Sequence, residues 1–357
     1  MSKKIVIGMS GGVDSSVAAY LLKEQGYDVM GVTMQTGSVP REVIDDAAGV
    51  AAKLGIPYDV VDFSEEFRRY VKDSFAGEYE RGRTPNPCIL CNRLVKWESL
   101  LSWAGKRGAD LVATGHYTKI LCLPNGRYTL KRAKGGKDQT YVLYGLSQDQ
   151  LCRTRMPLAD YRKEEVRKIA GEIGLAVADK PDSQEICFIP EGDYVGFLEE
   201  YAGKTMPEGN FVDREGRVLG RHRGLWRYTV GQRKGLGIAL GRPAFVLELR
   251  PQTNEVVLGT GEETLSRALW AEEIRPMAVE EIPEGEGIPL AAQIRYSHTP
   301  APGRLYMEEG RARFEFDTPQ RAVTPGQGVV FYQEDYIYAG GTIVSREGLA
   351  GPADRLV

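Results

Sequence analysis

The chain has 357 residues, and its 46 lysines and arginines against 49 aspartates and glutamates give a formal net charge of −3. Its 42% hydrophobic and 27% charged residues are typical of a globular protein and exclude a disordered chain, a coiled coil or collagen. No apolar run reaches the about 18 residues that a membrane span needs, and the start of the chain does not have the pattern of a secretory signal. We therefore expect a cytoplasmic protein of two or three domains that is not bound to a membrane.

Strands and helices alternate in residues 1–115. Apolar, β-branched runs predict strands at 4–9, 28–34, 58–63 and 110–114. Between them, amphipathic spacing predicts a helix at 13–25, a second that includes 43–54, a third that ends at about residue 79, and a fourth at 93–106. This order predicts a doubly wound parallel sheet, in which ligands bind beyond the carboxyl ends of the strands.

The later part of the chain has a different character. A hairpin with its turn at 124–126 and a helix at about 162–173 come first. After about residue 190, short β-branched runs dominate, at 244–249, 255–258, 304–308, 313–316 and 328–332. We predict a catalytic domain at 1–192, a middle domain at 193–270 and a β-barrel-like domain at 271–357.

Two windows of the sequence, 111–137 and 217–247, contain basic residues and no aspartate or glutamate. Together they hold thirteen cations: Lys119, Arg127, Lys131, Arg132, Lys134, Lys137, Arg217, Arg221, Arg223, Arg227, Arg233, Lys234 and Arg242. The second window also contains Trp226 and Tyr228, and cations mixed with aromatic rings suit a nucleic-acid surface. Either window alone favours a solvated basic face, but the two together point towards a polyanionic partner despite the net charge.

The string Ser10-Gly11-Gly12-Val13-Asp14-Ser15-Ser16 follows the first predicted strand and opens the first predicted helix. Glycines let an anion approach backbone amides, hydroxyls add donors, and a helix N-terminus favours negative charge. The string is neither a Walker A loop nor a G-x-G-x-x-G loop. A capped helix after a tight turn would explain only one or two of its residues. The whole string resembles the PP-loop of ATP pyrophosphatases, which adenylate a carbonyl-type oxygen and release pyrophosphate.

Five cysteines are present, at positions 88, 91, 122, 152 and 187. An odd number of cysteines in a long chain favours thiol or metal chemistry over a disulfide scaffold. Cys88 and Cys91 form a C-x-x-C in the proline-rich string 84–92, which suits a redox pair, half of a zinc site or half of an iron–sulfur site. No second C-x-x-C follows and the three histidines lack ligand spacing. Cys187, in the string 182–189, would by itself be a small buried hydrophobe.

Six strings occur in one order along the chain. They are the PP-loop, the cysteine loop, Thr114-Gly115-His116-Tyr117, Lys137-Asp138-Gln139, Ile186-Cys187-Phe188 and the stretch from Tyr228 to Gly237. From about residue 4 to residue 343, this set closely resembles the bacterial tRNA-specific 2-thiouridylase family (MnmA/TrmU). The resemblance implies an α/β doubly wound parallel sheet of the PP-loop, adenine nucleotide alpha hydrolase-like class, then a small middle domain and a C-terminal β-barrel-like domain.

The resemblance also implies the reaction, which is ATP-dependent 2-thiolation of the wobble uridine (U34) of tRNA by a sulfurtransferase of the ATP pyrophosphatase type. It implies ATP and Mg²⁺, and a sulfur donor that is a relay protein or sulfide. Cys91 matches the family's nucleophile and Cys187 its persulfide-bearing partner, and the two would end as a disulfide. The implied ATP-binding residues are Gly8, Met9, Ser10, Gly11, Gly12, Val13, Asp14, Ser15, Met34 and Gly115. The implied contacts to the target base or tRNA are Asn86, Pro87, Cys88, His116, Lys137, Asp138, Gln139, Arg295, Tyr296 and Gln327.

Two departures from the family pattern leave alternatives open. Many members have Asp at the position of Cys88, and a third thiol would let Cys88, Cys91 and Cys187 ligate a [4Fe–4S] cluster whose fourth iron binds sulfide. The stretch 35–41 is shorter than the family's usual insertion, which affects the details of ATP closure. Another PP-loop enzyme, such as a GMP, NAD or argininosuccinate synthetase, would leave Cys91 and Cys187 without a role. A tRNA-binding or sulfur-carrier protein without adenylation would leave the PP-loop unexplained.

Overall fold

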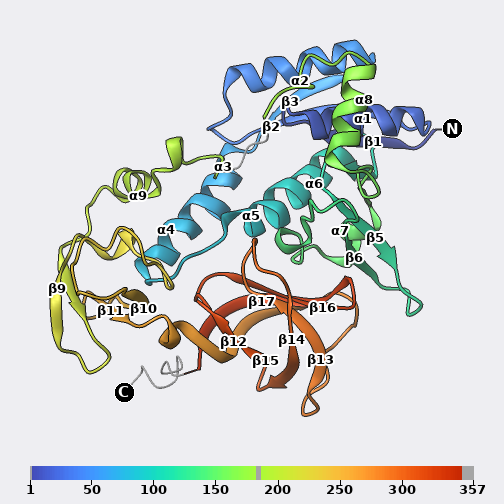
Figure 1. The fold of residues 1–357 in the computed structure, drawn as a ribbon. Coiled ribbons are helices and arrows are strands. Elements are labelled where there is room, and N and C mark those ends of the chain that lie inside the picture. The colour runs from blue at the N-terminus through green and yellow to red at the C-terminus, as the bar shows by residue number, and fades with distance from the viewer. Residues whose placement is uncertain (1, 182–185, 348–357) are drawn as a thin grey trace. The chain divides into compact units, whose positions relative to one another are not determined.

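The computed structural model describes residues 2–181 and 186–347, and the chain divides into two compact units (Figure 1). Unit 1 comprises Met1–Lys72, Pro87–Phe188 and Asp335–Ile337, and unit 2 comprises Asp73–Asn86, Ile189–Glu334 and Tyr338–Val357. The part 182–185 of the string around Cys187, and the end of the third predicted domain, lie outside the described residues. Among the described residues, no helix is both long enough and apolar enough to cross a membrane.

Unit 1 is built on a parallel sheet, as predicted. Its five strands lie in the order β3-β2-β1-β4-β7. Their bounds are β1 Lys4–Gly8, β2 Asp28–Gln35, β3 Tyr58–Asp62, β4 Leu111–Ala113 and β7 Thr154–Arg155. Only the two-residue β7 was not predicted. The chain reverses its strand order between β1 and β4, so the carboxyl ends of these two strands form the switch point where such sheets bind ligands.

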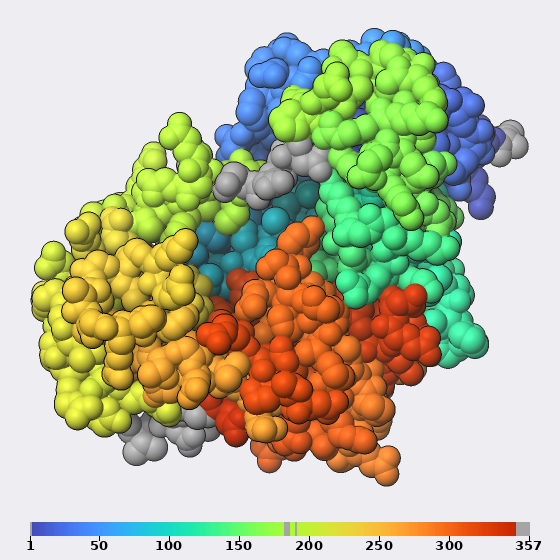
Figure 2. Space-filling view, viewed as in Figure 1, coloured from blue at the N-terminus to red at the C-terminus, as the bar shows by residue number. Residues whose placement is uncertain are grey.

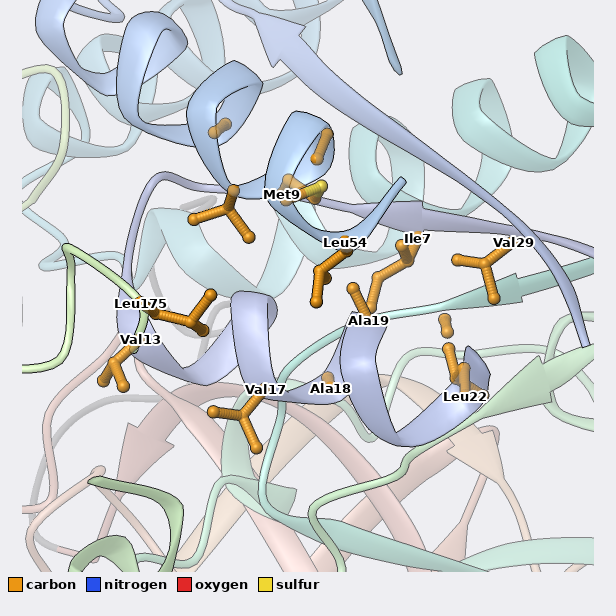
Figure 3. Packing of buried hydrophobic residues seen from close by; sticks show 14 of the residues in the cluster. Ile7, Met9, Val13, Val17, Ala18, Ala19, Leu22, Val29, Leu54 and Leu175 are labelled. Atoms are coloured by element: carbon orange, nitrogen blue, oxygen red, sulfur yellow. The ribbon is translucent and has the colours of Figure 1, made fainter. Parts of the chain in front are cut away.

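Apolar side chains of the strands and helices explain why the sheet forms. Ile5, Val6 and Ile7 of β1 are fully buried, as expected for a central strand covered on both faces. Helix α1 (Val13–Glu24) buries Val17 and Leu22 in the same cluster, which helices α2 (Arg41–Leu54) and α8 (Lys163–Glu172) complete. Figure 3 shows the side chains of α1 gathered with those of the neighbouring strands in this core.

The segments between β3 and β4 differ from the regular α-helices that we predicted. Two stretches are π-helical, η1 (Arg68–Lys72) and η2 (Cys91–Ser99). They adjoin α3 (Ser64–Phe67), α4 (Asp73–Glu80), α5 (Pro87–Leu90) and α6 (Leu100–Gly105). In η2, Asn92 donates to the Val142 carbonyl at 3.0 Å and Trp97 donates to Thr154 Oγ1 at 2.8 Å. Both side chains are buried and stand five residues apart, the spacing at which a π-helix repeats its hydrogen bonds, and such turns often mark functional sites.

The rest of unit 1 is a hairpin and two short helical segments. The predicted hairpin is confirmed as β5 (Thr118–Cys122) paired with β6 (Tyr128–Arg132). A 3-10 turn, η3 (Thr140–Val142), precedes α7 (Gln148–Cys152). Ser147 and Gln150 form a capping box at the N-terminus of α7. Helix α8 then begins at Lys163, close to its predicted start.

Unit 2 contains helix α9 (Tyr194–Ala202), a small sheet and a barrel, with short 3-10 turns at η4 (Pro190–Gly192), η5 (Leu225–Arg227) and η6 (Glu262–Thr264). The sheet has the order β10-β11-β8-β9, from β8 Gly209–Val212, β9 Val218–His222, β10 Phe245–Arg250 and β11 Glu255–Gly259. The barrel runs β12-β15-β14-β13-β16-β17 and closes through β12 pairing with β17. Its strands are β12 Leu265–Pro276, β13 Ile288–Gln293, β14 Ala301–Glu308, β15 Arg311–Arg321, β16 Gly328–Gln333 and β17 Tyr336–Arg346. The predicted C-terminal barrel is thus confirmed.

Two aromatic residues of the second basic window lie in the interior, which corrects our prediction. Trp226 is 1% exposed and Tyr228 is 3% exposed, and Tyr228 packs in the core of the small sheet with Phe211 and Leu225. The ring of Tyr228 meets that of Phe211 edge-on at 5.2 Å. These rings stabilise the fold of unit 2 and are not available to stack on nucleic-acid bases.

Candidate functional site

The loop from β1 to α1 has the shape of an anion cradle. Gly11 has a φ of +64°, and a Cβ there would lie 2.6 Å from the carbonyl oxygen of Val43, so only glycine fits. Gly12 is the N-cap residue before α1, and no side chain of the described residues caps this end, so the amides of the first turn point toward the space ahead of the helix. The Ser15 hydroxyl accepts from the Ser10 N–H at 3.1 Å and donates to the Gly12 carbonyl at 3.2 Å, which holds the loop in this shape.

Three further residues predicted to bind ATP, Gly8, Met34 and Gly115, lie near this loop. A Cβ on Gly8 would lie 3.3 Å from Met34 Cε. A Cβ on Gly115 would lie 2.7 Å from the amide nitrogen of Ser15, so the chain after β4 passes directly against the start of α1. Since β1 pairs with both β2 and β4, Gly8, Met34 and Gly115 meet at the carboxyl edge of the sheet.

Asp14, in the first turn of α1, is held by side chains from three distant segments. Its Oδ1 accepts from Lys163 Nζ at 2.6 Å and from the Tyr117 hydroxyl at 2.6 Å, and its Oδ2 accepts from Lys137 Nζ at 3.0 Å. The Lys137 ammonium also lies 5.0 Å from the centre of the Tyr117 ring. The structure therefore places Lys137, a predicted tRNA contact, at the PP-loop, together with Lys163, which the sequence did not single out.

The three cysteines of the predicted sulfur chemistry all belong to unit 1. Cys91 is the first residue of η2 and is buried, whereas Cys88 in α5 and Cys187 are exposed. Phe188, directly after Cys187, anchors that end of the segment by packing edge-on against Phe67 at 5.5 Å. No disulfide joins any of the five cysteines, all of which lie within the described ranges.

The thiols influence one another's ionisation. Burial raises the pKa of Cys91 to about 12, while the charge of Lys96 lowers it and the thiols of Cys187 and Cys88 raise it. Desolvation also raises the pKa of Cys187, even though its side chain reaches solvent, and the charges of Lys96 and Lys72 oppose this rise. A thiolate nucleophile needs a lowered pKa, so both cysteines are neutral thiols at pH 7 in this state.

His116 lies beside η2 as a neutral imidazole. Its Nδ1 is 2.8 Å from Thr114 Oγ1, and its ring centre is 5.6 Å from that of Trp97. Burial lowers the pKa of His116 to about 3, and the charges of Lys96 and Lys137 lower it further. Any contact that it makes to tRNA would therefore come from an uncharged ring, which suits a base better than a phosphate.

The other predicted contact residues of unit 1 shape its loops. Asp138 accepts from the Thr140 hydroxyl at 2.7 Å and from Arg132 Nε at 3.3 Å. Gln139 Oε1 accepts from the Tyr117 N–H at 2.9 Å, which ties this segment to the residue that holds Asp14. Pro87, which begins α5, is buried. These contacts fix the conformation of the segment.

In unit 2, the predicted contact residues lie on the barrel and at the start of the cysteine loop. Arg295 donates to the Arg321 carbonyl at 3.2 Å, and the Tyr296 side chain is 47% exposed. Gln327 Nε2 donates to the Thr84 carbonyl at 2.7 Å. Asn86 is the last residue of this segment of unit 2.

The two windows without acids in the sequence have acidic neighbours in space. Carboxylates from outside the windows lie within 4.0 Å of seven of the thirteen cations, namely Lys119, Lys131, Arg132, Lys137, Arg217, Arg221 and Arg227. By contrast, Arg233 and Arg242 are exposed and line an open surface cavity of about 390 Å³ with residues 235–238, 243 and 244. In Figure 2, residues around 230–250 form a gold-coloured part of the visible surface of unit 2. This cavity therefore presents two exposed cations of the second window to solvent.

Comparison with known proteins decides the family. A family model described as the tRNA methyl transferase HUP domain matches residues 3–191, the tRNA methyl transferase PRC-barrel domain matches 195–260, and the Aminomethyltransferase beta-barrel domain matches 266–343. The tRNA-specific 2-thiouridylase MnmA of Lachnoclostridium phytofermentans is 56% identical over 357 residues, covering 96% of this chain and 99% of that protein. The chain belongs to the tRNA-specific 2-thiouridylase family. Its relative of the same name in Carboxydothermus hydrogenoformans is 50% identical, covering 96% of this chain and 98% of that protein. Among solved structures, the NMN synthetase of Francisella tularensis is 16% identical with a TM-score of 0.35, covering 58% of this chain and 79% of that one.

Membership of this 2-thiouridylase family, with its PP-loop, implies ATP and Mg²⁺. The described residues fit the phosphates, since the glycine turn at Gly11, the uncapped start of α1 and the two lysines paired with Asp14 all belong to or contact the PP-loop. Among the described residues, no group of three or more His, Cys, Asp or Glu side chains is arranged to hold a metal ion. Mg²⁺ beside a nucleotide takes most ligands from phosphates and water, so it needs no such group. A [4Fe–4S] cluster on Cys88, Cys91 and Cys187 would need one, and it has no support in this arrangement.

Two residues of the candidate site were not singled out from the sequence. Lys163 is the first residue of α8, a position where acidic residues are preferred because of the helix dipole. A lysine at a helix start is therefore the sequence feature that could have identified Lys163. Lys96 follows Cys91 by five residues, a spacing that would attract attention only if η2 had been expected to be π-helical.

Proposed function

We propose that this chain catalyses ATP-dependent 2-thiolation of the wobble uridine of tRNA. The observation that carries the proposal is the presence, in unit 1 of a 2-thiouridylase family member, of both a PP-loop at the sheet's switch point and the pair Cys91 and Cys187. Its partners would be tRNA and a sulfur donor, either a relay protein or sulfide.

The first step of the proposed reaction activates the base. The C2 oxygen of uracil attacks the α-phosphorus of ATP, pyrophosphate leaves, and AMP becomes the leaving group on C2. Helix α1 begins without a side-chain cap from the described residues, so the amides of its first turn would stabilise the charge that builds up on the departing pyrophosphate. Donors that are positioned in advance stabilise such charge without reorganising. The target uridine would leave its stack to reach the site, at a cost of a few kcal/mol.

The second step of the proposed reaction transfers sulfur. Cys187 Sγ first takes the outer sulfur of a persulfide on the relay protein, which leaves as a thiol, and the persulfide now on Cys187 attacks C2 through its terminal sulfur, so that AMP leaves. Cys91 Sγ then attacks Cys187 Sγ, so that the bond from Cys187 to the transferred sulfur breaks and its electron pair stays on 2-thiouridine. The transferred sulfur gains two electrons, the two thiols lose two, and the Cys91 proton passes to solvent. An external dithiol must afterwards reduce the Cys91–Cys187 disulfide.

The raised pKa values of Cys91 and Cys187 favour this order of events. A neutral thiol is a weak nucleophile, whereas a persulfide ionises more readily than the thiol that carries it. Cys91 would therefore act late, when the mixed disulfide is already in place. Cys88 stands where many relatives have Asp, and its exposed thiol lies close enough to influence both partners.

The test incubates the full-length protein with unmodified tRNA, ATP, Mg²⁺ and a donor that carries persulfide sulfur, and measures 2-thiouridine by nucleoside mass spectrometry. We expect Cys91→Ala and Cys187→Ala to abolish thiolation while pyrophosphate release continues. Cys152→Ala, a partly buried cysteine outside the strings, is the matched control and should retain activity. Full turnover in Cys91→Ala would support an ammonia- or amino-acid-dependent PP-loop synthetase instead. Failure to release pyrophosphate would support a tRNA-binding or sulfur-carrier protein.

Iron and labile sulfide analysis after anaerobic purification separates the persulfide route from the cluster route. We expect active protein with neither iron nor visible absorbance. About four iron atoms per active chain, lost together in Cys88→Ala, would replace the persulfide with a cluster-bound sulfide.

A further inference from the structure

The carboxylate of Asp14 joins two lysines that belong to different segments of unit 1. Lys163 comes from the first turn of α8, and Lys137 comes from the loop after β6. The side chains of Lys163, Asp14 and Lys137 are 16%, 23% and 27% exposed, so the group is partly withdrawn from water. One carboxylate thus receives two ammonium groups at the nucleotide edge of the sheet.

The position of this group relates it to phosphate binding. Asp14 lies in the first turn of α1, and a Cβ on Gly115 would lie 2.8 Å from its carbonyl carbon. Because Asp14 follows Gly12 by two residues, the ammonium groups that it binds lie at the first turn of α1. Lysine is a compact charge that binds phosphate oxygens well.

A lysine at the start of α8 is electrostatically unfavourable unless its ammonium group binds an anion. A cation at the start of a helix is opposed by the helix dipole. At the start of α8, Arg162 and Glu165 satisfy the local backbone, since Glu165 Oε2 accepts from the Arg162 N–H at 2.7 Å. Lys163 is thus not needed to cap its own helix, and its side chain reaches Asp14 on α1 instead.

We propose that Lys163, together with Lys137, binds the polyphosphate of ATP, and that Asp14 holds both ammonium groups in place before the nucleotide arrives. This inference rests on the proposed function, because it assigns residues to the ATP site. A polyphosphate carries more negative charge than one carboxylate and competes for the same ammonium groups. The same pair would then neutralise charge on pyrophosphate as it leaves. Lys137 acts here at the nucleotide, apart from any contact that its string makes with tRNA.

The experiment measures binding of ATP, inorganic pyrophosphate and adenosine to the full-length protein by calorimetry, without tRNA. Lys163→Met and Lys137→Met are compared with two matched controls. The first control is Lys168→Met, because Lys168 lies on the same helix as Lys163, is exposed and pairs with Glu172 at 3.7 Å. The second is Lys134→Met, because Lys134 is exposed in the same loop as Lys137. We expect Lys163→Met and Lys137→Met to weaken ATP and pyrophosphate binding at least tenfold. Adenosine binding should stay within twofold, as should ATP binding by both controls.

Three results separate this inference from its alternatives. Wild-type protein that does not bind ATP would contradict the proposed function itself. Wild-type protein that binds ATP, with unchanged affinity in a folded Lys163→Met protein, would overturn this inference and leave Lys163 as a structural ion pair. If Lys163→Met does not fold, acylation of lysines in the wild-type protein gives the answer. ATP or pyrophosphate should then protect Lys163 and not Lys168, and equal labelling with and without them would overturn the inference.

Discussion

The side-chain amide of Gln327 donates to the main-chain carbonyl of Thr84 at 2.7 Å, and the Thr84 N–H donates to the carbonyl of Pro325 at 2.9 Å. Both polar backbone groups of Thr84 are thus bound by the turn that precedes β16, within unit 2. Gly326, between the two partners, has a φ of +92°, and a Cβ there would lie 2.9 Å from the Thr84 nitrogen. Since Thr84 begins the string that leads to Cys88 and Cys91, this turn fixes where the cysteine loop starts.

Replacing Gln327 tests whether this residue acts on the loop or on tRNA. We expect Gln327→Ala to lower the free energy of unfolding by about 0.5–1.5 kcal/mol, the usual loss for one hydrogen bond. Thermal unfolding measures the loss, and the exposed Gln252→Ala is the control that should leave stability unchanged. If Gln327 only contacts tRNA, as the family resemblance implied, stability would stay the same and tRNA affinity alone would fall.

Gly115 tests the close approach of the chain to the PP-loop. In Gly115→Ala, the new Cβ would lie 2.7 Å from the Ser15 nitrogen and 2.8 Å from the Asp14 carbonyl carbon, both backbone atoms that cannot swing away. We expect this variant to lose most of its affinity for ATP, because the amides at the start of α1 must shift. Gly49→Ala, in the middle of α2 with no atom within 4 Å of its Cβ, should fold normally and gain about 0.5–1 kcal/mol. Equal ATP affinity in the two variants would show that the cradle tolerates the shift.

Local patterns predicted much of this fold, and long-range contacts account for what they missed. The runs that form β1 and α1 carry their own periodicity, so their bounds matched within one residue. The π-helix at Cys91 depends on Asn92 and Trp97 reaching residues 142 and 154, and no local pattern contains that information. Trp226 was assigned to a binding surface from its basic neighbours, but the sequence does not tell which side of a short irregular segment faces the core.

The candidate site shows the same division. The family resemblance implied that Gly8, Gly11 and Gly115 share one ATP site, and the parallel sheet brings them together because the carboxyl ends of its strands lie at one edge. The ion pair of Asp14 with Lys163 spans 149 positions in the sequence and joins two helices, so it became visible only in the fold. The two basic windows were likewise defined along the sequence, so they left out acidic residues that pack against them in space. Asp335, which pairs with Lys131, is one example.

Lys96 tests how the thiol site is tuned. Its positive charge lowers the pKa of both Cys91 and Cys187, against desolvation that raises them. Removing the charge in Lys96→Met should raise both pKa values further, so less thiolate is present at pH 8 and alkylation of Cys187 by iodoacetamide slows. Each pKa unit corresponds to about a tenfold lower rate. Peptide mass spectrometry follows the modification, and the exposed Lys106→Met, at the end of the same helical segment, is the control. An unchanged rate would mean that Lys96 is too far from the sulfur to matter.

Arg233 and Arg242 test the polyanion surface of unit 2. Both are exposed at the cavity of about 390 Å³, whereas Arg217 is already paired with Asp213 at 2.6 Å and with Glu215 at 3.2 Å. Each phosphate contact that is lost should flatten the plot of log affinity against log salt by about one unit. We therefore expect the double variant Arg233→Gln and Arg242→Gln to weaken tRNA binding and reduce this slope by up to about two units. Arg217→Gln should change the slope little, because its carboxylate partners already neutralise it. A slope that is unchanged in the double variant would identify the cavity as a solvated basic face with no phosphate contact.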